Sequence, residues 1–169
     1  METLQAILTR RSIKKYTSKK ISQDQIETIL KAAMYAPSAK NSQPWHFIVL
    51  EDRNDIDQIH KLNPRNEMML QAPAAIIVCG DSSIEPNIDN LVMSCSAAAQ
   101  NALLAVHSLG LGSVWVSAYP IKDIIEGIKK YFNLPENIVP FSVIPVGYPD
   151  EVKENDDRFH KEKIHLNRW

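Results

Sequence analysis

Residues 87–109 read NIDNLVMSCSAAAQNALLAVHSL, and nearly every helical turn of this segment is small or apolar. The pattern predicts a long helix that is buried on most sides, because apolar residues around most of its circumference leave little surface suited to water. Its many alanines permit close approach by a neighbouring element. In a chain of 169 residues, such a helix favours an interface between subunits. Gly110 is well placed to end the helix in the left-handed conformation.

The remaining elements follow from periodicity. Apolar residues at helical spacing predict further helices at residues 3–9, 22–36, 52–61 and 121–132. Apolar runs predict strands at residues 46–50, 74–79, 112–116 and 139–146. The run at 74–79 is continuous, as in a strand buried on both faces, and Pro140 and Pro145 suit an edge or irregular last strand. Ser22 and Gln25 form a capping box, and Met68, Met69 and Leu70 are expected to point inward.

The composition indicates one compact domain, residues 1–169, with enough hydrophobic content (44%) for a packed core. The 19 Lys+Arg nearly cancel the 20 Asp+Glu, so no global field attracts nucleic acid or an acidic membrane. The sequence lacks both a signal peptide and an apolar run of the ~20 residues that span a bilayer, which predicts a cytoplasmic protein. Cys79 and Cys95 stand in apolar segments, which favours buried, reduced thiols.

Three cations and a hydroxyl lie together in Arg10-Arg11-Ser12-Ile13-Lys14. The 3–9 helix should bury one face through Leu4, Ile7 and Leu8 and present the two arginines at its C-terminal end. Arginine grips phosphate oxygens with a planar fork, and lysine adds a point charge. The segment therefore suits an anion, most plausibly a phosphate. A solvated basic rim is the alternative, because charge runs usually face water.

The most unusual local composition is Pro37-Ser38-Ala39-Lys40-Asn41-Ser42-Gln43-Pro44-Trp45. Its serines, asparagine and glutamine can all donate or accept, which suits a polar heterocycle or a polyol chain. A plain turn, in which these side chains cap their own backbone, is the alternative.

Familiar catalytic motifs are missing from the sequence. It contains no Gly-x-Ser-x-Gly elbow, no Walker loop and no His-Glu-x-x-His helix. No metal site or catalytic side chain is expected. A chain with anion-binding residues but no nucleophile or acid–base pair is typical of proteins whose chemistry is carried by a cofactor.

Four blocks in the chain together resemble the nitroreductase family of flavin mononucleotide (FMN) enzymes. They are residues 10–16, the loop at 36–45, the alanine-rich helix running into residues 109–115, and Val146-Gly147-Tyr148-Pro149. They stand in the family's order across nearly the whole chain. The tail, with Arg158, His165 and Trp169, is similar to that of the family's compact members.

The resemblance implies an α+β fold of the three-layer α/β type, with a central mixed sheet flanked by helices. It also implies an intertwined homodimer with two FMN molecules at its interface. The residues that it places around FMN are Arg10, Arg11, Ser12, Lys14 and Arg158 at the phosphate and ribityl end, Pro37, Ser38, Ala39, Asn41 and Gln43 from the partner subunit, and Ser117, Ala118 and Gly147 near the ring. Gly147 could equally be a simple turn glycine.

The activity implied by the resemblance is a ping-pong reduction, in which NADH or NADPH gives hydride to the flavin and then leaves. A small-molecule acceptor such as a nitroaromatic or quinone follows on the same face. Alternatives are a non-catalytic flavin-binding or sensing protein, reductive dehalogenation, or breakdown of the flavin itself. A phosphate-binding module without flavin is also open, although the polar loop argues against it.

The chain departs from the family pattern at two places. Lys14 stands where arginine is common, which replaces a bidentate grip with a point charge. The long excursion that covers the flavin in larger relatives is missing, which suggests a more open site. No residue between Arg65 and Met69 can be assigned to the flavin from the sequence.

Overall fold

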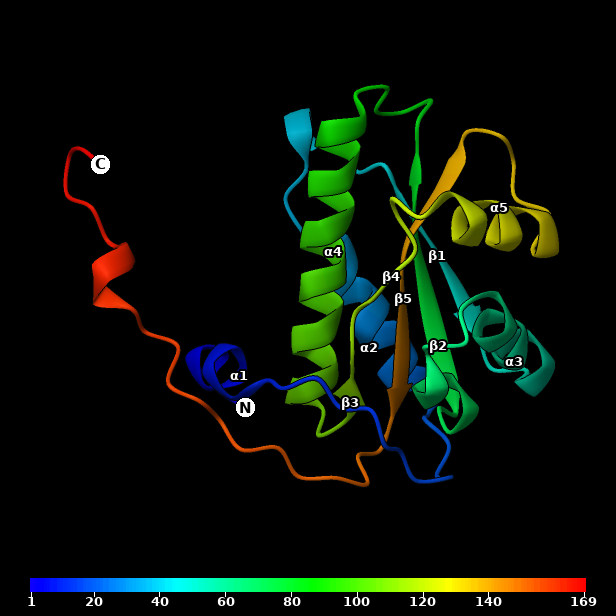
Figure 1. The fold of residues 1–169 in the computed structure, drawn as a ribbon, viewed down its shortest axis with the longest axis horizontal. Helices are drawn as coiled ribbons and strands as arrows, with labels where there is room; N and C mark the ends of the chain where they lie inside the picture. Colours follow the sequence, from blue (N-terminus) through cyan, green and yellow to red (C-terminus); the bar gives the residue numbers. More distant parts are fainter.

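The computed structural model describes residues 1–169 and has three layers, with helices on both faces of a central sheet (Figure 1). The strands are β1 (Trp45–Leu50), β2 (Ala74–Asp81), β3 (Gly112–Ser113), β4 (Val116–Ser117) and β5 (Ile138–Gly147). The helices are α1 (Thr3–Thr9), α2 (Gln23–Met34), α3 (Arg53–Leu62), α4 (Ile88–Ser108) and α5 (Lys122–Tyr131). Short 3₁₀ turns are η1 (Ala39–Asn41), η2 (Glu67–Leu70) and η3 (Lys161–Lys163). The predicted α+β class and three-layer type are confirmed.

The sheet has the strand order β1-β2-β5-β3, and β4 also pairs with β5. All four ladders are antiparallel, so the expected mixed character is limited to one parallel bridge between Ser12 and Ser113. That bridge attaches the segment after α1 to the edge of the sheet.

Strand β2 is buried along its whole length, as its continuous apolar run predicts. Ala74, Ile76 and Val78 join the core beneath α2 and α4, and alternate residues such as Ile77 and Cys79 join the core beneath α3 and α5. This alternation follows from the two-residue period of a strand. Cys79 and Cys95 are both buried and free, as predicted.

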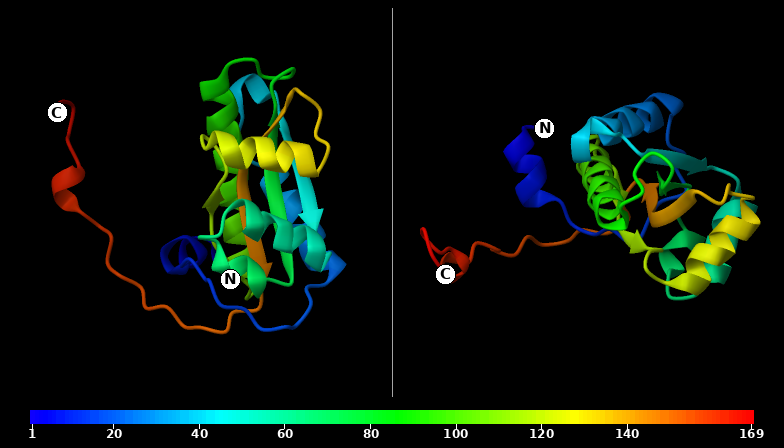
Figure 2. Two further views of the ribbon diagram at one scale, coloured as in Figure 1. Left: turned by 45° about the vertical axis from the view of Figure 1, so that its right-hand side comes forward. Right: turned by 90° about the horizontal axis from the view of Figure 1, so that it is seen from above.

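Helix α4 packs beside α2 on one face of the sheet (Figure 2). The α2 capping box is present, because the Ser22 hydroxyl accepts from the Gln25 N–H while the Gln25 side chain accepts from the Ser22 N–H. Gly110 has φ +74° after α4, which confirms its left-handed conformation. Only part of the α4 circumference is covered in one chain, and Met93 is 61% exposed.

The sequence predicted that β5 would be either an edge strand or an irregular strand. It is irregular, but it does not lie at an edge. It pairs with β2 on one side and with β3 and β4 on the other. The ladder is irregular where Pro140 lies opposite Cys79, because the register shifts between Val78 and Cys79. Pro145 lies between the residues of β5 that pair with β4 and those that pair with β3, so its missing N–H falls beside an interruption in that neighbour.

Two smaller expectations are also wrong. The predicted strand at 112–116 is split into β3 and β4, because Val114 and Trp115 leave the ladder between them. Leu70 does not point inward and is 52% exposed, whereas Met68 and Met69 are buried. The tight turns of η2 place Leu70 on the solvent side.

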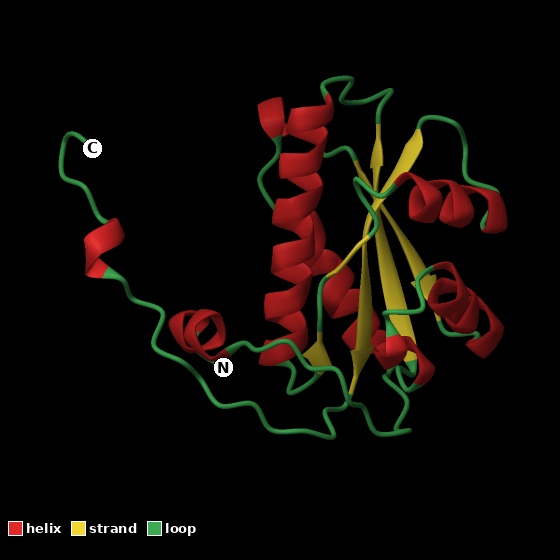
Figure 3. Ribbon diagram, viewed as in Figure 1, coloured by secondary structure: helices red, strands yellow, loops and turns green.

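Helix α1 has the predicted bounds but not the predicted burial. Leu4 and Leu8 are 72% and 74% exposed, and only Ala6 is buried. The tail beyond residue 149 runs away from the three layers as loop, apart from η3 (Figures 1 and 3). No helix combines the length and apolar character needed to span a membrane.

Candidate functional site

The basic segment lies along the sheet edge beside β3. The Ile13 N–H donates to the Ser113 carbonyl at 2.9 Å, next to the bridge between Ser12 and Ser113. A Cβ on Gly112 would lie 2.6 Å from Cγ2 of Ile13, so only glycine lets the segment approach this closely. The segment therefore has a fixed course after α1, with Arg10 as the C-terminal cap residue of that helix.

The structure brings three arginines together. Burial lowers the pKa of Arg10, and the positive charges of Arg158 and Arg11 lower it further. Arg11 pairs with Asp156 of the tail at 2.9 Å, but its Nη1 atom is buried without a partner. A single carboxylate, that of Asp156, thus pairs with one of the three guanidinium groups. We call Arg10, Arg11 and Arg158 the arginine cluster. A phosphate would relieve its mutual repulsion and supply an acceptor for Nη1.

Lys14 lies at a separate cavity of about 360 Å³. The lining residues are Lys14, Lys15, Arg65, Glu67, Met68, Gln71, Glu151 and Lys153. Glu151 accepts from the Lys14 N–H at 2.5 Å and pairs with Lys153 at 3.0 Å. Burial opposes the charge on Glu151, but these contacts outweigh it and lower its pKa. Arg65 therefore lies at the same cavity as Lys14. The sequence alone did not reveal this proximity.

The polar loop forms a compact turn around η1. Lys40, Asn41 and Gln43 all have positive φ, near +50°. The Gln43 N–H donates to the Ser38 hydroxyl at 2.9 Å, and the Gln43 side chain donates to the Asn41 side chain at 3.2 Å. Part of the loop's polar potential is therefore satisfied internally, as the plain-turn alternative expects. Pro37, Ser38 and Ala39 also line a cavity of about 260 Å³ against α4.

One chain does not bring this loop to the arginine cluster. The loop cavity lies against Asn90 to Ala97 of α4, whereas Arg10 lies close enough to His107 to lower its pKa. At 1.5 Å per residue, Ser94 and His107 are separated by about 20 Å along the helix. The two groups of predicted site residues therefore lie toward opposite ends of α4.

Ser117 ends β4, and Ala118 follows it directly. Ser117 is exposed and pairs with Ser142. Ala118 is fully buried and donates its N–H to the Phe141 carbonyl at 3.0 Å. The Ala118 donor is thus already used within the sheet.

Gly147 permits a close approach within the chain itself. A Cβ there would lie 2.8 Å from Cδ of Pro73 and 2.9 Å from Cβ of Tyr16. Tyr16 follows the basic segment directly, and its hydroxyl donates to the Ile13 carbonyl at 2.6 Å. Gly147 therefore allows the close packing of Tyr16 that helps to position the basic segment.

Thr9 and His107 also lie beside the arginine cluster, and sequence reasoning missed both. The Thr9 hydroxyl contacts Nε2 of His107 at 2.8 Å. Burial lowers the pKa of His107, and the charge of Arg10 lowers it further. Nothing in the local sequence indicates this pairing, because the two residues are 98 positions apart.

The fold and the arginine cluster define a class of three-layer α+β proteins suited to a phosphate-bearing cofactor. Residues 7–65 and 57–148 match the sequence profile of the nitroreductase family. The chain belongs to this family.

Individual relatives agree with this assignment. A Methanothermobacter thermautotrophicus protein, provisionally named NADH dehydrogenase/NAD(P)H nitroreductase, is 49% identical over 100% of this chain and 88% of its own. A Bacteroides thetaiotaomicron structure with the same provisional name is 43% identical, with a TM-score of 0.94 over 99% of this chain and 98% of its own. A Desulfovibrio desulfuricans structure, provisionally named nitroreductase and solved with FMN, is 29% identical, with a TM-score of 0.87 over 100% and 98%.

Proposed function

We propose that this protein is an FMN-dependent oxidoreductase that uses NADH or NADPH to reduce small acceptors such as nitroaromatics or quinones. The observation that carries the proposal is the arginine cluster, in which the charges of Arg158 and Arg11 act on Arg10, and Arg11 keeps a buried Nη1 without a partner although it pairs with Asp156. Membership of the nitroreductase family supports the flavin and the nicotinamide donor. So do the FMN in one solved relative and the NAD(P)H in the name of another.

The residues present fit a flavin phosphate. The orphaned Nη1 of Arg11 needs an acceptor, and a phosphate dianion offers several oxygens. Arg10, Arg11, Ser12 and Arg158 would hold the phosphate and the adjoining ribityl chain. Lys14 and Arg65 share the neighbouring cavity and would place positive charge beside the cofactor. This charge favours binding of the cofactor's more negative forms.

When bound, FMN supplies the redox chemistry by accepting hydride from the nicotinamide and passing electrons to the acceptor. The chain's own residues bind and orient the cofactor, and none needs to act as an acid or a base. We infer a ping-pong order, because the donor and the acceptor would use one open face in turn. No catalytic side chain is assigned.

A second copy of the chain would complete the site. Pro37, Ser38, Ala39, Asn41 and Gln43 lie too far along α4 to reach the arginine cluster of their own chain, so we propose that they contact FMN from the partner of a homodimer. Exposed apolar side chains on α1 and α4 support this arrangement. Leu4, Leu8 and Met93 would become buried when two chains pack together.

The test is a visible absorption spectrum of the purified protein, followed by anaerobic addition of NADH and then NADPH. A yellow protein that bleaches, and recovers its colour with a quinone or nitroarene, supports the proposal and identifies the donor. A yellow protein that does not bleach would point to a flavin carrier or sensor. A colourless protein that fails to take up added FMN would overturn the cofactor assignment.

A further inference from the structure

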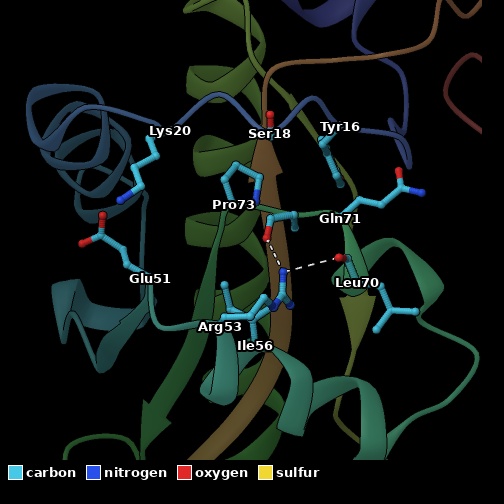
Figure 4. A pocket seen from close by; sticks show the side chains of 10 residues that line it. Tyr16, Ser18, Lys20, Glu51, Arg53, Ile56, Leu70, Gln71 and Pro73 are labelled. Atoms are coloured by element: carbon cyan, nitrogen blue, oxygen red, sulfur yellow. Dashed lines mark hydrogen bonds between the residues drawn. The ribbon is translucent and has the colours of Figure 1, made fainter.

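Arg53, at the start of α3, makes contacts that no sequence pattern indicated. Its side chain enters a cavity of about 440 Å³ beside the connection between α3 and β2 (Figure 4). Nη2 donates to the Met69 carbonyl at 2.6 Å, and Nη1 donates to the Ala72 carbonyl at 3.1 Å and to the Leu70 carbonyl at 3.5 Å. Nε pairs with Asp57 at 2.8 Å, one helical turn further along α3.

These carbonyls belong to a segment with little regular hydrogen bonding. Residues 67–72 form η2 and the short approach to β2, where no strand partner donates to the carbonyls. Met69 and Ala72 are buried, and buried carbonyls need donors. The guanidinium supplies donors to these two carbonyls and also reaches the carbonyl of the exposed Leu70. Arg53 therefore fixes the backbone of this segment from one side.

The other side of the same segment lines the Lys14 cavity. Met68 and Gln71 are sequence neighbours of the residues whose carbonyls Arg53 binds, and both line the cavity that contains Lys14, as does Glu67. Gln71 lines both the Lys14 cavity and the Arg53 cavity. The segment is thus a thin wall between the two, with Arg53 on one side and Lys14 on the other.

We propose that Arg53 is a positioning residue for the cofactor site, because it holds the 67–72 wall at a fixed distance from Lys14. This inference rests on the proposed function, in which Lys14 and its cavity lie beside the bound FMN. Arginine suits the role because its planar fork reaches several carbonyls at once while Nε remains paired with Asp57. A cation in the first turn of a helix is otherwise unfavourable, so the carbonyl contacts and Asp57 account for its stability there.

The experiment compares Arg53→Met and Arg53→Lys with the control Asp57→Asn, which removes the ion pair but keeps every donor to the wall. In the FMN-loaded protein, Arg53→Met should weaken FMN binding at least about tenfold, because small misplacements of supporting groups have effects of this size. It should also shift the flavin reduction potential. Arg53→Lys should recover part of both changes, and Asp57→Asn should stay within about twofold of the native protein.

A second readout needs no cofactor. Amide hydrogen exchange across residues 66–72 should accelerate in Arg53→Met and remain near native in Asp57→Asn. If Arg53→Met is too unstable to purify, Arg53→Lys carries both measurements. Native FMN affinity and potential in an Arg53 variant with faster exchange would overturn the positioning role. Failure of the native protein itself to bind FMN would instead overturn the proposed function.

Discussion

The Thr9 hydroxyl lies 2.8 Å from Nε2 of His107 and joins the end of α1 to the last turn of α4. That hydroxyl donates its proton to the Gln5 carbonyl at 2.7 Å, so it accepts from His107, which carries a proton on Nε2. Burial and the nearby Arg10 lower the pKa of His107 and favour its neutral form. The histidine thus supports the arginine cluster without adding a charge to it.

This arrangement makes the free energy of unfolding depend on pH. In the unfolded chain His107 gains its proton near its ordinary pKa of about 6.5, whereas the folded chain resists that proton to lower pH. The unfolded state therefore binds more protons in this window, and stability should fall as the pH drops from about 7 through 6. His107→Asn should flatten this dependence in urea unfolding at several pH values.

A control separates the site from histidine content. His165→Asn removes an exposed histidine of the tail and should leave the native dependence on pH intact. An unchanged slope in His107→Asn would contradict the lowered pKa of this histidine in the folded chain.

The arginine cluster gives a second prediction. Arg10→Ala and Arg158→Ala should each weaken FMN binding by about 1.5 to 3 kcal/mol, the range for a lost charge-assisted hydrogen bond. Titrating FMN into the cofactor-free protein, followed by flavin fluorescence, measures this affinity. Arg168→Ala, which removes an exposed arginine from the same tail, is the matched control. Native FMN affinity in both variants would contradict the assignment of Arg10 and Arg158 to the phosphate site.

The sequence was most informative where one residue pattern has one physical solution. The continuous apolar run of β2 can only be buried on both faces, and Ser22 with Gln25 places the start of α2. At β5 the two prolines left an edge strand and an irregular strand open, and only the irregular strand is confirmed. In this fold Pro140 and Pro145 instead coincide with a register shift and an interrupted neighbour, which depend on strands distant in sequence.

The site divides in the same way. Residues 10–14 are adjacent in the sequence, so their shared charge could be read directly. Other contacts join segments that are distant in the sequence. They are Arg53 with the carbonyls of residues 69–72, Thr9 with His107, and Lys14 with Arg65 at one cavity. No local pattern encodes them. The exposure of Leu4 and Leu8 also differs from the expected burial, and in the proposed homodimer the partner subunit would cover them.

A third prediction concerns that surface. Leu8→Glu places a charge on the exposed apolar side of α1, and burying an unpaired carboxylate between subunits is unfavourable. The variant should therefore shift the proposed homodimer toward monomer in sedimentation velocity. Ile121→Glu, a partly exposed apolar residue at the start of α5 on the opposite layer, should leave the association unchanged. A native protein that sediments as a monomer with FMN bound would contradict the dimer proposal.

The last prediction tests whether Gly147 sets the course of the basic segment. An added Cβ would meet Tyr16 and Pro73 at 2.8 to 2.9 Å, and Tyr16 is buried with its hydroxyl tied to the Ile13 carbonyl. Tyr16 cannot yield without moving residues 13–16, so Gly147→Ala should cost about 1 to 3 kcal/mol of stability and also weaken FMN binding.

Gly110→Ala is the matched control, because Gly110 has φ +74° but open space around its Cβ position. Its cost should be backbone strain alone, about 1 to 2 kcal/mol, with FMN affinity unchanged. Urea unfolding and FMN titration on both variants separate the two effects. Equal losses of stability with native FMN affinity in both would mean that Gly147 serves only the turn. A loss of FMN affinity confined to Gly147→Ala would show that Gly147 supports the cofactor site indirectly. Its missing side chain lets Tyr16 pack closely, and Tyr16 in turn holds the basic segment that includes Lys14.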